Sequence, residues 1–244
     1  MADGFSIAAL GMINDMERMN GISQNLTNAL TPGYKRSIPF NTVLSGINAT
    51  SATPGLGAPA PVASAPVAAM VLDMKQGTLR ATGNPLDLAI ENSGFFEVQR
   101  DGQTYYTRQG NFVIDASARL ATQTGDVVSG LSGDLKLTGS QPTIDRKGQI
   151  LENGKVVGQI KLVQFDDPAL LQAVGEGKYL QGGASLKSDD KIAVRQGHLE
   201  ASNVNTAAEM VRMIETMRHF ETGQKIIQMY DAMNEGVISK LGQF

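Results

Sequence analysis

The sequence predicts an α+β protein: paired long helices at the two ends of the chain form a coiled-coil-like inner domain, with an all-β domain inserted between them. Apolar residues recur at helical intervals in both terminal segments. The middle alternates short β-branched or aromatic runs with turn residues, and a stretch rich in Gly, Pro, Ala and Ser separates it from the first helix. The expected segments are an N-terminal helix (1–34), an extended bracing linker (35–74), an all-β outer domain (75–200) and a C-terminal helix (201–244).

The N-terminal helix is predicted from a row of residues with alternate spacings of four and three, nearly all of them apolar: Phe5, Ala9, Met12, Met16, Met19, Ser23, Leu26 and Leu30. The helix should end near Leu30, because Pro32-Gly33 disfavours helix in the residue before it and favours a type II turn. Residues 19–34 carry no charge. A polar face of amides such as Asn25 and Asn28 avoids the cost of burying ions, so we expect neighbouring protein around this helix.

The C-terminal helix is predicted from a second apolar row. Thr206 and Glu209 have the spacing of a capping box at its start. The row that follows comprises Met210, Ile214, Met217, Ile226, Tyr230, Met233, Val237, Leu241 and Phe244. One such row does not by itself offset the entropy lost on ordering a helix, so we expect both ends of the chain to gain order when they pack on a partner.

The middle of the chain has the turn signals of an all-β domain. They are Gly83-Asn84-Pro85, Asp101-Gly102, Gly125-Asp126, Gly133-Asp134 and Asn153-Gly154. One segment reads as a helix instead, because Asp167 is a suitable cap, Pro168 suits a first turn and Gly175 suits a stop. Residues 45–69 have linker composition.

Composition and charge narrow the range of possible functions and locations. The formal net charge is −3 and the Lys and Arg residues are scattered, so we expect no nucleic-acid partner. No stretch predicts a membrane helix, since the uncharged residues 37–72 are interrupted by prolines. No positive side chain precedes Arg18, so we expect no cleaved secretory signal.

No catalytic or metal-binding pattern emerges from the sequence. His198 and His219 lack the spacing of a metal site, and the chain has no Cys. The acidic pairs at 166–167 and 189–190 are more simply caps or polar turns than acid–base catalysts. We therefore expect a protein that is not an enzyme and that needs no metal or cofactor.

Three motifs resemble those of bacterial flagellar rod and hook proteins. NLTNALTPGYKR (25–36) resembles their N-terminal signature, and GHLEASNVNTAAEMVRMIETMRHFE (197–221) resembles the C-terminal one. LDLAIENSGFFEVQRDGQTYYTRQGNFVID (86–115) is similar to the β-domain motif of the longer members. The chain departs from the family pattern at Ala118, where a turn glycine is usual, and Ala adopts positive φ less readily than Gly.

The resemblance implies an axial structural protein of the flagellar basal body. Its terminal helices would line a hollow, torque-transmitting tube of sister molecules and other rod subunits that spans the periplasm. The flagellar type III apparatus would export the chain without signal cleavage, with Phe40 and Leu44 resembling a short apolar export motif. A single β domain in a chain of this length resembles the proximal rod subunit that carries one, and the distal rod protein is the alternative.

These inferences give a set of expected assembly residues and two competing functions. The interface would comprise Phe5, Met12, Met16, Met19, Asn25, Leu26, Asn28, Leu30, Val211, Ile214, Met217, Phe220, Ile226, Tyr230, Met233, Val237 and Leu241. One competing function is a freestanding β-domain binding protein whose helices form a stalk. The other is an enzyme whose site is assembled from loops, for which the sequence offers no positive sign.

Overall fold

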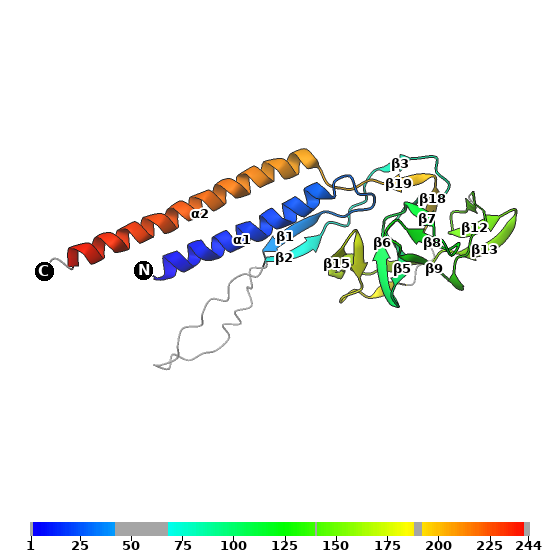
Figure 1. The fold of residues 1–244 in the computed structure, drawn as a ribbon, viewed down its shortest axis with the longest axis horizontal. Coiled ribbons are helices and arrows are strands. Elements are labelled where there is room, and N and C mark those ends of the chain that lie inside the picture. The colour runs from blue at the N-terminus through cyan, green and yellow to red at the C-terminus, as the bar shows by residue number, and fades with distance from the viewer. Residues whose placement is uncertain (1, 42–67, 140, 188–191, 242–244) are drawn as a thin grey trace, which may run out of the picture. The chain divides into compact units, whose positions relative to one another are not determined.

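The computed structural model describes residues 2–41, 68–139, 141–187 and 192–241 (Figure 1). The chain forms two compact units. The helical unit comprises Met1–Gln24, Ser37–Val71 and Ala207–Phe244, and the β unit comprises Asn25–Arg36 and Leu72–Thr206. The segment that follows the first helix therefore belongs to the β unit, although it lies far from most of that unit in the sequence.

The helical unit contains the long helices α1 (Ala2–Thr27) and α2 (Thr206–Leu241) and a two-stranded sheet of β1 (Ser37–Asn41) and β2 (Ala68–Leu72). Gly21 permits a close approach between α1 and β2, because a Cβ at this position would lie 2.0 Å from Cε of Met70. Ile22 beside it is buried. α1 ends at Thr27, three residues before the predicted end, and turns follow it through Thr31.

The predicted coiled-coil-like inner domain of paired helices is wrong. Four predicted seam residues are about half exposed: Phe5, Met16, Ile214 and Met217. Where α1 and α2 approach each other, the contacts involve Asp15 with His219 and Met12 beside Gly223 (Figure 1). An ion-pair partner and a glycine are not the apolar knobs that a coiled-coil seam requires. The described chain is a mixture of two helices and many antiparallel strands.

The β unit consists of short strands in antiparallel sheets. The main sheet has the order β15-β16-β6-β5-β9-β8-β7, with β10 on β9, β14 on β5 and β17 on β14. Its strands are β5 (Phe95–Arg100), β6 (Gln103–Thr107), β7 (Phe112–Ile114), β8 (Leu120–Thr122), β9 (Val127–Gly130), β10 (Gly133–Asp134), β14 (Leu162–Phe165), β15 (Gln172–Gly175), β16 (Lys178–Leu180) and β17 (Leu186–Lys187).

Three smaller sheets complete the β unit. They are β11 (Thr143–Ile144), β12 (Gln149–Glu152) and β13 (Lys155–Gln159); β18 (Val194–Gln196) with β4 (Leu88–Ile90); and β19 (His198–Glu200) with β3 (Leu79–Ala81). The last two pairings join strands that are more than 100 residues apart in the chain. The residues before α2 are thus held against the start of the β unit.

Two predicted turns connect hairpins, β5 to β6 and β12 to β13. Asp101-Gly102 and Asn153-Gly154 both have positive φ at their two residues, which is the geometry of the tight turns that join twisted strands. Ala118 also has a positive φ, of 60°. This confirms that its turn adopts the conformation for which glycine is better suited.

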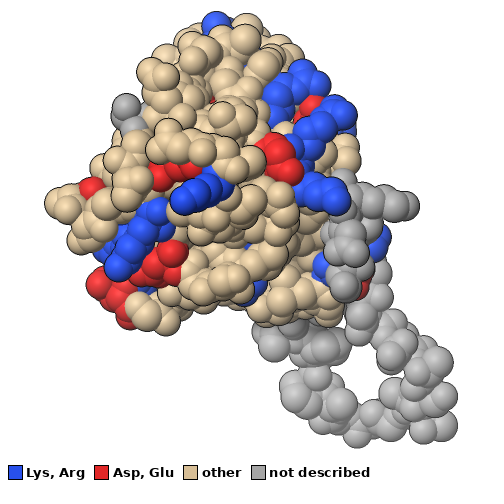
Figure 2. Space-filling model, turned by 90° about the vertical axis from the view of Figure 1, so that its right-hand side faces the viewer, with Lys and Arg blue, Asp and Glu red and all other residues tan. Residues whose placement is uncertain are grey.

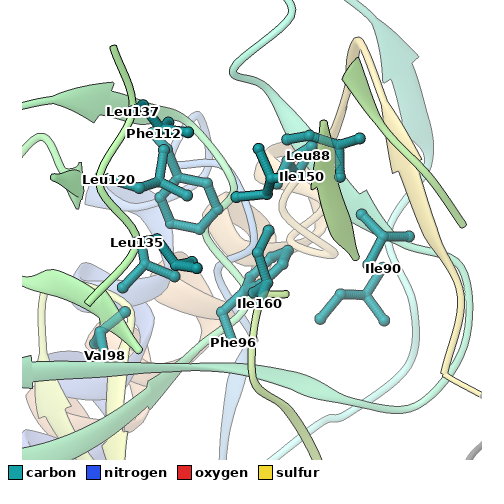
Figure 3. Packing of buried hydrophobic residues seen from close by; sticks show 13 residues of the cluster. Leu88, Ile90, Phe96, Val98, Phe112, Leu120, Leu135, Leu137, Ile150 and Ile160 are labelled. Carbon is teal, nitrogen blue, oxygen red and sulfur yellow. The ribbon is translucent and has the colours of Figure 1, made fainter. Parts of the chain in front are cut away.

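Adjacent residues of β5 feed two separate apolar clusters, because successive strand side chains point to opposite faces. Phe96 and Val98 belong to the larger cluster, which Figure 3 shows with residues from β4, β7, β8, β12 and the segments around them. There Phe96 meets Phe112 edge to face with ring centroids 5.0 Å apart. Phe95 lies in the second cluster, against Phe165 and Tyr179.

The helix predicted between Asp167 and Gly175 is reduced to a single 3₁₀ turn, Pro168–Leu170. Asp167 caps this turn as predicted, and its side chain accepts a hydrogen bond from the backbone N–H of Ala169. The following residues instead form β15, because they pair with β16 at the edge of the main sheet. The pairing partner, which a local pattern does not reveal, decides between helix and strand here.

Candidate assembly surfaces

The segment after α1 forms a tight turn that is fixed to the β unit. Tyr34 N–H donates to the carbonyl of Thr31 and Gly33 has φ 69°, which confirms the predicted type II turn. Gly33 N–H also donates to the carbonyl of Glu200 at 2.8 Å. A Cβ on Gly33 would lie 2.4 Å from the backbone of Arg108. Only glycine therefore satisfies both the turn and the close approach.

Buried charges then join this segment to three others, and we call this cluster the signature junction: Lys35, Arg108 and Glu200 with the backbone of residues 75–77. Lys35 Nζ donates to Glu200 Oε1 at 2.6 Å and to the carbonyl of Lys75 at 2.7 Å. Arg108 Nε donates to Glu200 Oε2 at 2.8 Å, and the backbone N–H of Gly77 donates to Oε1. Both oxygens of Glu200 are thus engaged by donors from distant parts of the chain.

The signature junction is almost completely shielded from water. The side chains of Lys35 and Glu200 are each 1% exposed. Burial and the nearby Arg108 guanidinium lower the pKa of Lys35, against the opposite effect of Glu200. The other Arg108 donors bind the carbonyls of Gly94 and Asn92. Because its charges and hydrogen-bonding groups are already engaged by one another, the arrangement holds these segments together.

Sequence reasoning missed the signature junction. Its two partners of opposite charge, Lys35 and Glu200, are 165 residues apart. Lys35 lies in the N-terminal signature and Glu200 in the C-terminal one. The presence of opposite charges in these two signatures was the one feature of the sequence that could have indicated the pair. The amides of the N-terminal signature are also engaged within the chain: Asn25 is buried and accepts a hydrogen bond from the Tyr34 hydroxyl, and Asn28 accepts one from Thr31.

Each of the two long helices carries several exposed apolar side chains, and others, such as Leu131 and Val156, lie on the β unit. On α1 the exposed ones are Phe5, Ile7, Leu10, Ile13 and Met16; on α2 they are Met210, Val211, Ile214, Met217, Met229 and Met233. Each is at least a third exposed. A scattered apolar residue on a surface needs no explanation, but rows of them along two helices make these faces candidate surfaces for contact with other protein.

The predicted interface residues fall into several classes of exposure. Phe5, Met16, Leu30, Val211, Ile214, Met217 and Met233 are exposed; Met12, Met19, Leu26, Asn28, Phe220, Ile226 and Tyr230 are half-buried; Asn25 is buried. The side chains of Val237, Leu241 and Phe40, and the whole of Leu44, lie outside the described residues. The prediction omitted the exposed residues Ile7, Leu10 and Ile13, because it followed one periodic row of α1 and these residues lie outside that row.

The charged surface of the β unit is mixed. Figure 2 shows Lys and Arg side chains close to Asp and Glu side chains on the face in view. Glu91, for example, pairs with Arg146 at 3.3 Å and with Arg195 at 2.6 Å. Within the described residues no three His, Asp or Glu side chains converge as metal ligands would. No helix there is long and apolar enough to cross a membrane.

These features define a structural protein: long helices with exposed apolar rows, joined to a β unit whose buried charges are mutually paired. Comparison with known proteins gives the same class. The family described as "Flagellar hook protein FlgE/F/G D1 domain" matches residues 89–158. The family described as "Flagellar basal body rod FlgEFG protein C-terminal" matches residues 195–239.

Full-length relatives agree with these domain matches. The flagellar basal-body rod protein FlgG of Buchnera aphidicola from Acyrthosiphon pisum is 31% identical, with 97% of each chain covered. The rod proteins FlgF of Salmonella typhimurium and Escherichia coli K12 are each 33% identical, covering 90% and 86% of both chains respectively. The chain belongs to the family of flagellar basal-body rod proteins. It is a structural rod subunit of the flagellar basal body, it is not an enzyme, and it assembles with other rod subunits.

Proposed function

We propose that the exposed apolar faces of α1 and α2 are the surfaces through which this rod subunit packs against its neighbours in a hollow, torque-transmitting tube that spans the periplasm. The observation that carries the proposal is the half-exposed state of large apolar side chains along both helices, such as Met16, Ile214 and Met217. Fully burying an exposed side chain of this kind contributes about 1.5 to 3 kcal/mol, so burying the exposed half of each contributes roughly half of that, and several together support a specific contact.

The β unit plays a different part in this proposal. Its apolar side chains are largely buried in its own two clusters, and its buried ions are paired. A unit with buried cores of its own projects from the assembly and needs no partner to bury those cores. Within this unit the signature junction holds Lys35, in the segment after α1, to Glu200, so force applied to that segment reaches the strands through buried hydrogen bonds.

We test the helix faces by adding charge. Ile214→Glu and Met217→Glu, made separately, each place a carboxylate within the exposed row of α2, and Thr222→Glu places one at another exposed position of the same helix. In a strain that lacks its own copy, the first two variants should give no intact rods in purified basal bodies and no spreading in soft agar, because desolvating an unpaired charge is costly. Thr222→Glu should retain both.

Intact rods with both Ile214→Glu and Met217→Glu would contradict the proposal. Circular dichroism of each purified variant separates loss of assembly from loss of folding. The competing function, a freestanding binding protein with a helical stalk, requires that both substitutions be silent and that the chain remain a monomer at every concentration.

We also propose that the flagellar type III apparatus exports the chain without signal cleavage and that Phe40 and Leu44 take part. The support is the resemblance of this pair to an apolar export motif. The double variant Phe40→Ala/Leu44→Ala should accumulate in the cytoplasm and fall in the secreted fraction, whereas Ile214→Glu should still be secreted. Equal secretion of the double variant and the unaltered chain would exclude this role.

The position along the rod is a further part of the proposal. We place the subunit in the proximal rod, because the chain carries one β unit in 244 residues. A distal position is the second candidate, since relatives named FlgG and FlgF match at 31% and 33% identity. Gold-labelled antibody against the β unit, applied to purified basal bodies, should label the end of the rod near the inner membrane. Label at the hook end would favour the distal position.

A further inference from the structure

The β unit contains a hollow of about 280 Å³ between the segment after α1 and the β3–β19 pair. One wall is formed by Ala29, Leu30 and Pro32, and the other includes Arg80, Ala81 and Leu199. Most of this lining is apolar or small. Glu200 also contributes to the lining, but the signature junction already engages its carboxylate.

Leu30 marks this hollow as incomplete. Its side chain is 92% exposed, more than any other large apolar side chain in the described part of the chain. Exposed apolar surface of this kind marks a site of contact with other protein. Ordinary surface exposure explains Leu30 less well, because the lining beside it is apolar too.

Arg80 adds a charge requirement to the hollow. It is exposed, and within the described residues it has no ion-pair partner. A guanidinium beside an apolar surface binds a carboxylate well, since its planar donors match the two oxygens. A partner surface that fits this hollow is therefore apolar and carries one acidic group at its end.

The exposed row of α2 has this composition. Met210, Ile214 and Met217 follow one another at intervals of four and three, and Glu221 continues the row four residues later. Glu221 is exposed and, in the described part of the chain, has no ion-pair partner. Met217 and Glu221 are one helical turn apart, so their Cβ atoms are about 6 Å from each other on the same face of the helix.

We propose that the hollow of one copy binds the α2 row of a second copy, with the end of that row against Leu30 and with Glu221 paired to Arg80. The proposal rests on the proposed function and names one contact within it. Because the hollow and the row are different surfaces of the same chain, the contact is head-to-tail and leaves one of each surface open at the ends. Repetition of such a contact builds a filament and does not close as a dimer of identical surfaces.

Charge reversal tests the pairing. Arg80→Glu alone and Glu221→Arg alone should each weaken self-association by about tenfold or more in sedimentation velocity, because like charges then face each other. An equimolar mixture of the two variants should recover association, since each hollow then finds a complementary row on the other variant. Failure of the mixture to exceed either variant alone would overturn the proposal, as would unchanged association of both single variants.

A cross-link tests the location directly, because the chain has no cysteine of its own. Full-length Ala81→Cys, mixed with full-length Met217→Cys and treated with a short bismaleimide, should give a cross-linked dimer that contains one of each. Leu30→Ala in the Ala81→Cys chain should reduce the yield by about tenfold. Val113→Cys, an exposed position that does not line the hollow, is the control for Ala81→Cys and should give little product.

The competing occupant is the apolar face of α1. If Ile13→Cys cross-links to Ala81→Cys and Met217→Cys does not, this contact is wrong. A different result would decide whether the proposed function itself is wrong. Rods that assemble normally with Arg80→Glu but not with Ile214→Glu would exclude this contact and leave assembly through the helix faces in place.

Discussion

Glu200 accepts hydrogen bonds from three other segments of the chain, so we expect the stability of the fold to depend on it more than on an exposed ion pair. Glu200→Gln keeps the shape of the side chain but leaves Lys35 and Arg108 buried without a counter-charge. Removing one partner of a buried ion pair typically costs about 3 to 5 kcal/mol. We expect a loss of this size in the free energy of unfolding, measured by urea titration with circular dichroism.

Glu176→Gln is the matched control for this prediction. Its carboxylate pairs with Lys178 but its side chain is 57% exposed, so the loss should remain below about 1 kcal/mol. Equal effects of the two substitutions would mean that the signature junction is no more important than a surface pair.

Gly33 tests the close approach within the junction. Gly33→Ala introduces both a strained positive φ and a contact of 2.4 Å with the backbone of Arg108. Gly102→Ala introduces the strain alone, because nothing lies within 4 Å of its Cβ position. We expect Gly102→Ala to cost about 1 to 2 kcal/mol of unfolding free energy and Gly33→Ala at least about 2 kcal/mol more. Similar values for the two would show that the loop adapts.

Ala118 offers the opposite case, a residue whose replacement should stabilise the protein. Ala118→Gly relieves a φ of 60° and should raise the free energy of unfolding by up to about 1 kcal/mol. Ala169→Gly, at a position with no positive φ, should lower it. A lower stability of Ala118→Gly than of the unaltered chain would show that the turn does not strain the alanine.

At this scale, local chemistry was predictable and distant pairing was not. The turns at Pro32-Gly33 and Asp101-Gly102 could be predicted, because the preference for positive φ is a property of the residues themselves. The Lys35–Glu200 pair depends on two segments that meet only after folding. No spacing rule relates residues so far apart.

At the scale of elements, periodicity identified helices and strands better than it identified their faces. The apolar row of α1 correctly indicates a helix. It does not tell which side is buried: Asp15, outside the row, is buried and contacts His219, whereas Phe5 and Met16 of the row are about half exposed. The segment from 167 to 175 shows the same limit, since its pairing with β16 overrides its helical pattern.

The strands of the β unit are linked by carboxylates whose state should make its stability depend on acid. Hydrogen bonds from the backbone and side chain of Arg119 lower the pKa of Asp115. Burial of Asp126 opposes ionisation, but bonds from Thr124, Lys178 and Thr122 outweigh it and lower its pKa as well. The unfolded chain then binds more protons than the folded chain below the ordinary carboxyl pKa. The resulting stability is present above about pH 4.5 and is lost as the pH falls through the folded values.

We expect the urea midpoint of the full chain to fall steadily between about pH 5 and about pH 2. Asp115→Asn should make this fall shallower, since one contributing group no longer titrates. Asp101→Asn, at an exposed turn position whose side chain accepts no hydrogen bond within the described residues, serves as the control. A urea midpoint that does not change with pH in this range would contradict the lowered pKa values of Asp115 and Asp126.

At the scale of the whole molecule, we propose that the helix faces serve assembly, whereas the β unit has buried apolar clusters of its own. The β unit buries two clusters of apolar side chains, although others, such as Leu30 and Leu131, are exposed. The two long helices keep theirs half exposed. The family could be predicted because its signatures lie at both ends and in the middle of the sequence. The exposed faces of the helices could not be predicted, because the exposure of a residue depends on which other elements pack beside it.

Hydrogen–deuterium exchange of the backbone amides in α1 and α2 tests the central claim, comparing the dilute chain with assembled rods. If neighbouring subunits cover the helix faces, exchange around Met16 and between Met210 and Met217 should slow by about a hundredfold or more on assembly, while the core strand β5 changes little. Equal exchange of these helical amides in the free chain and in the rod would contradict the account.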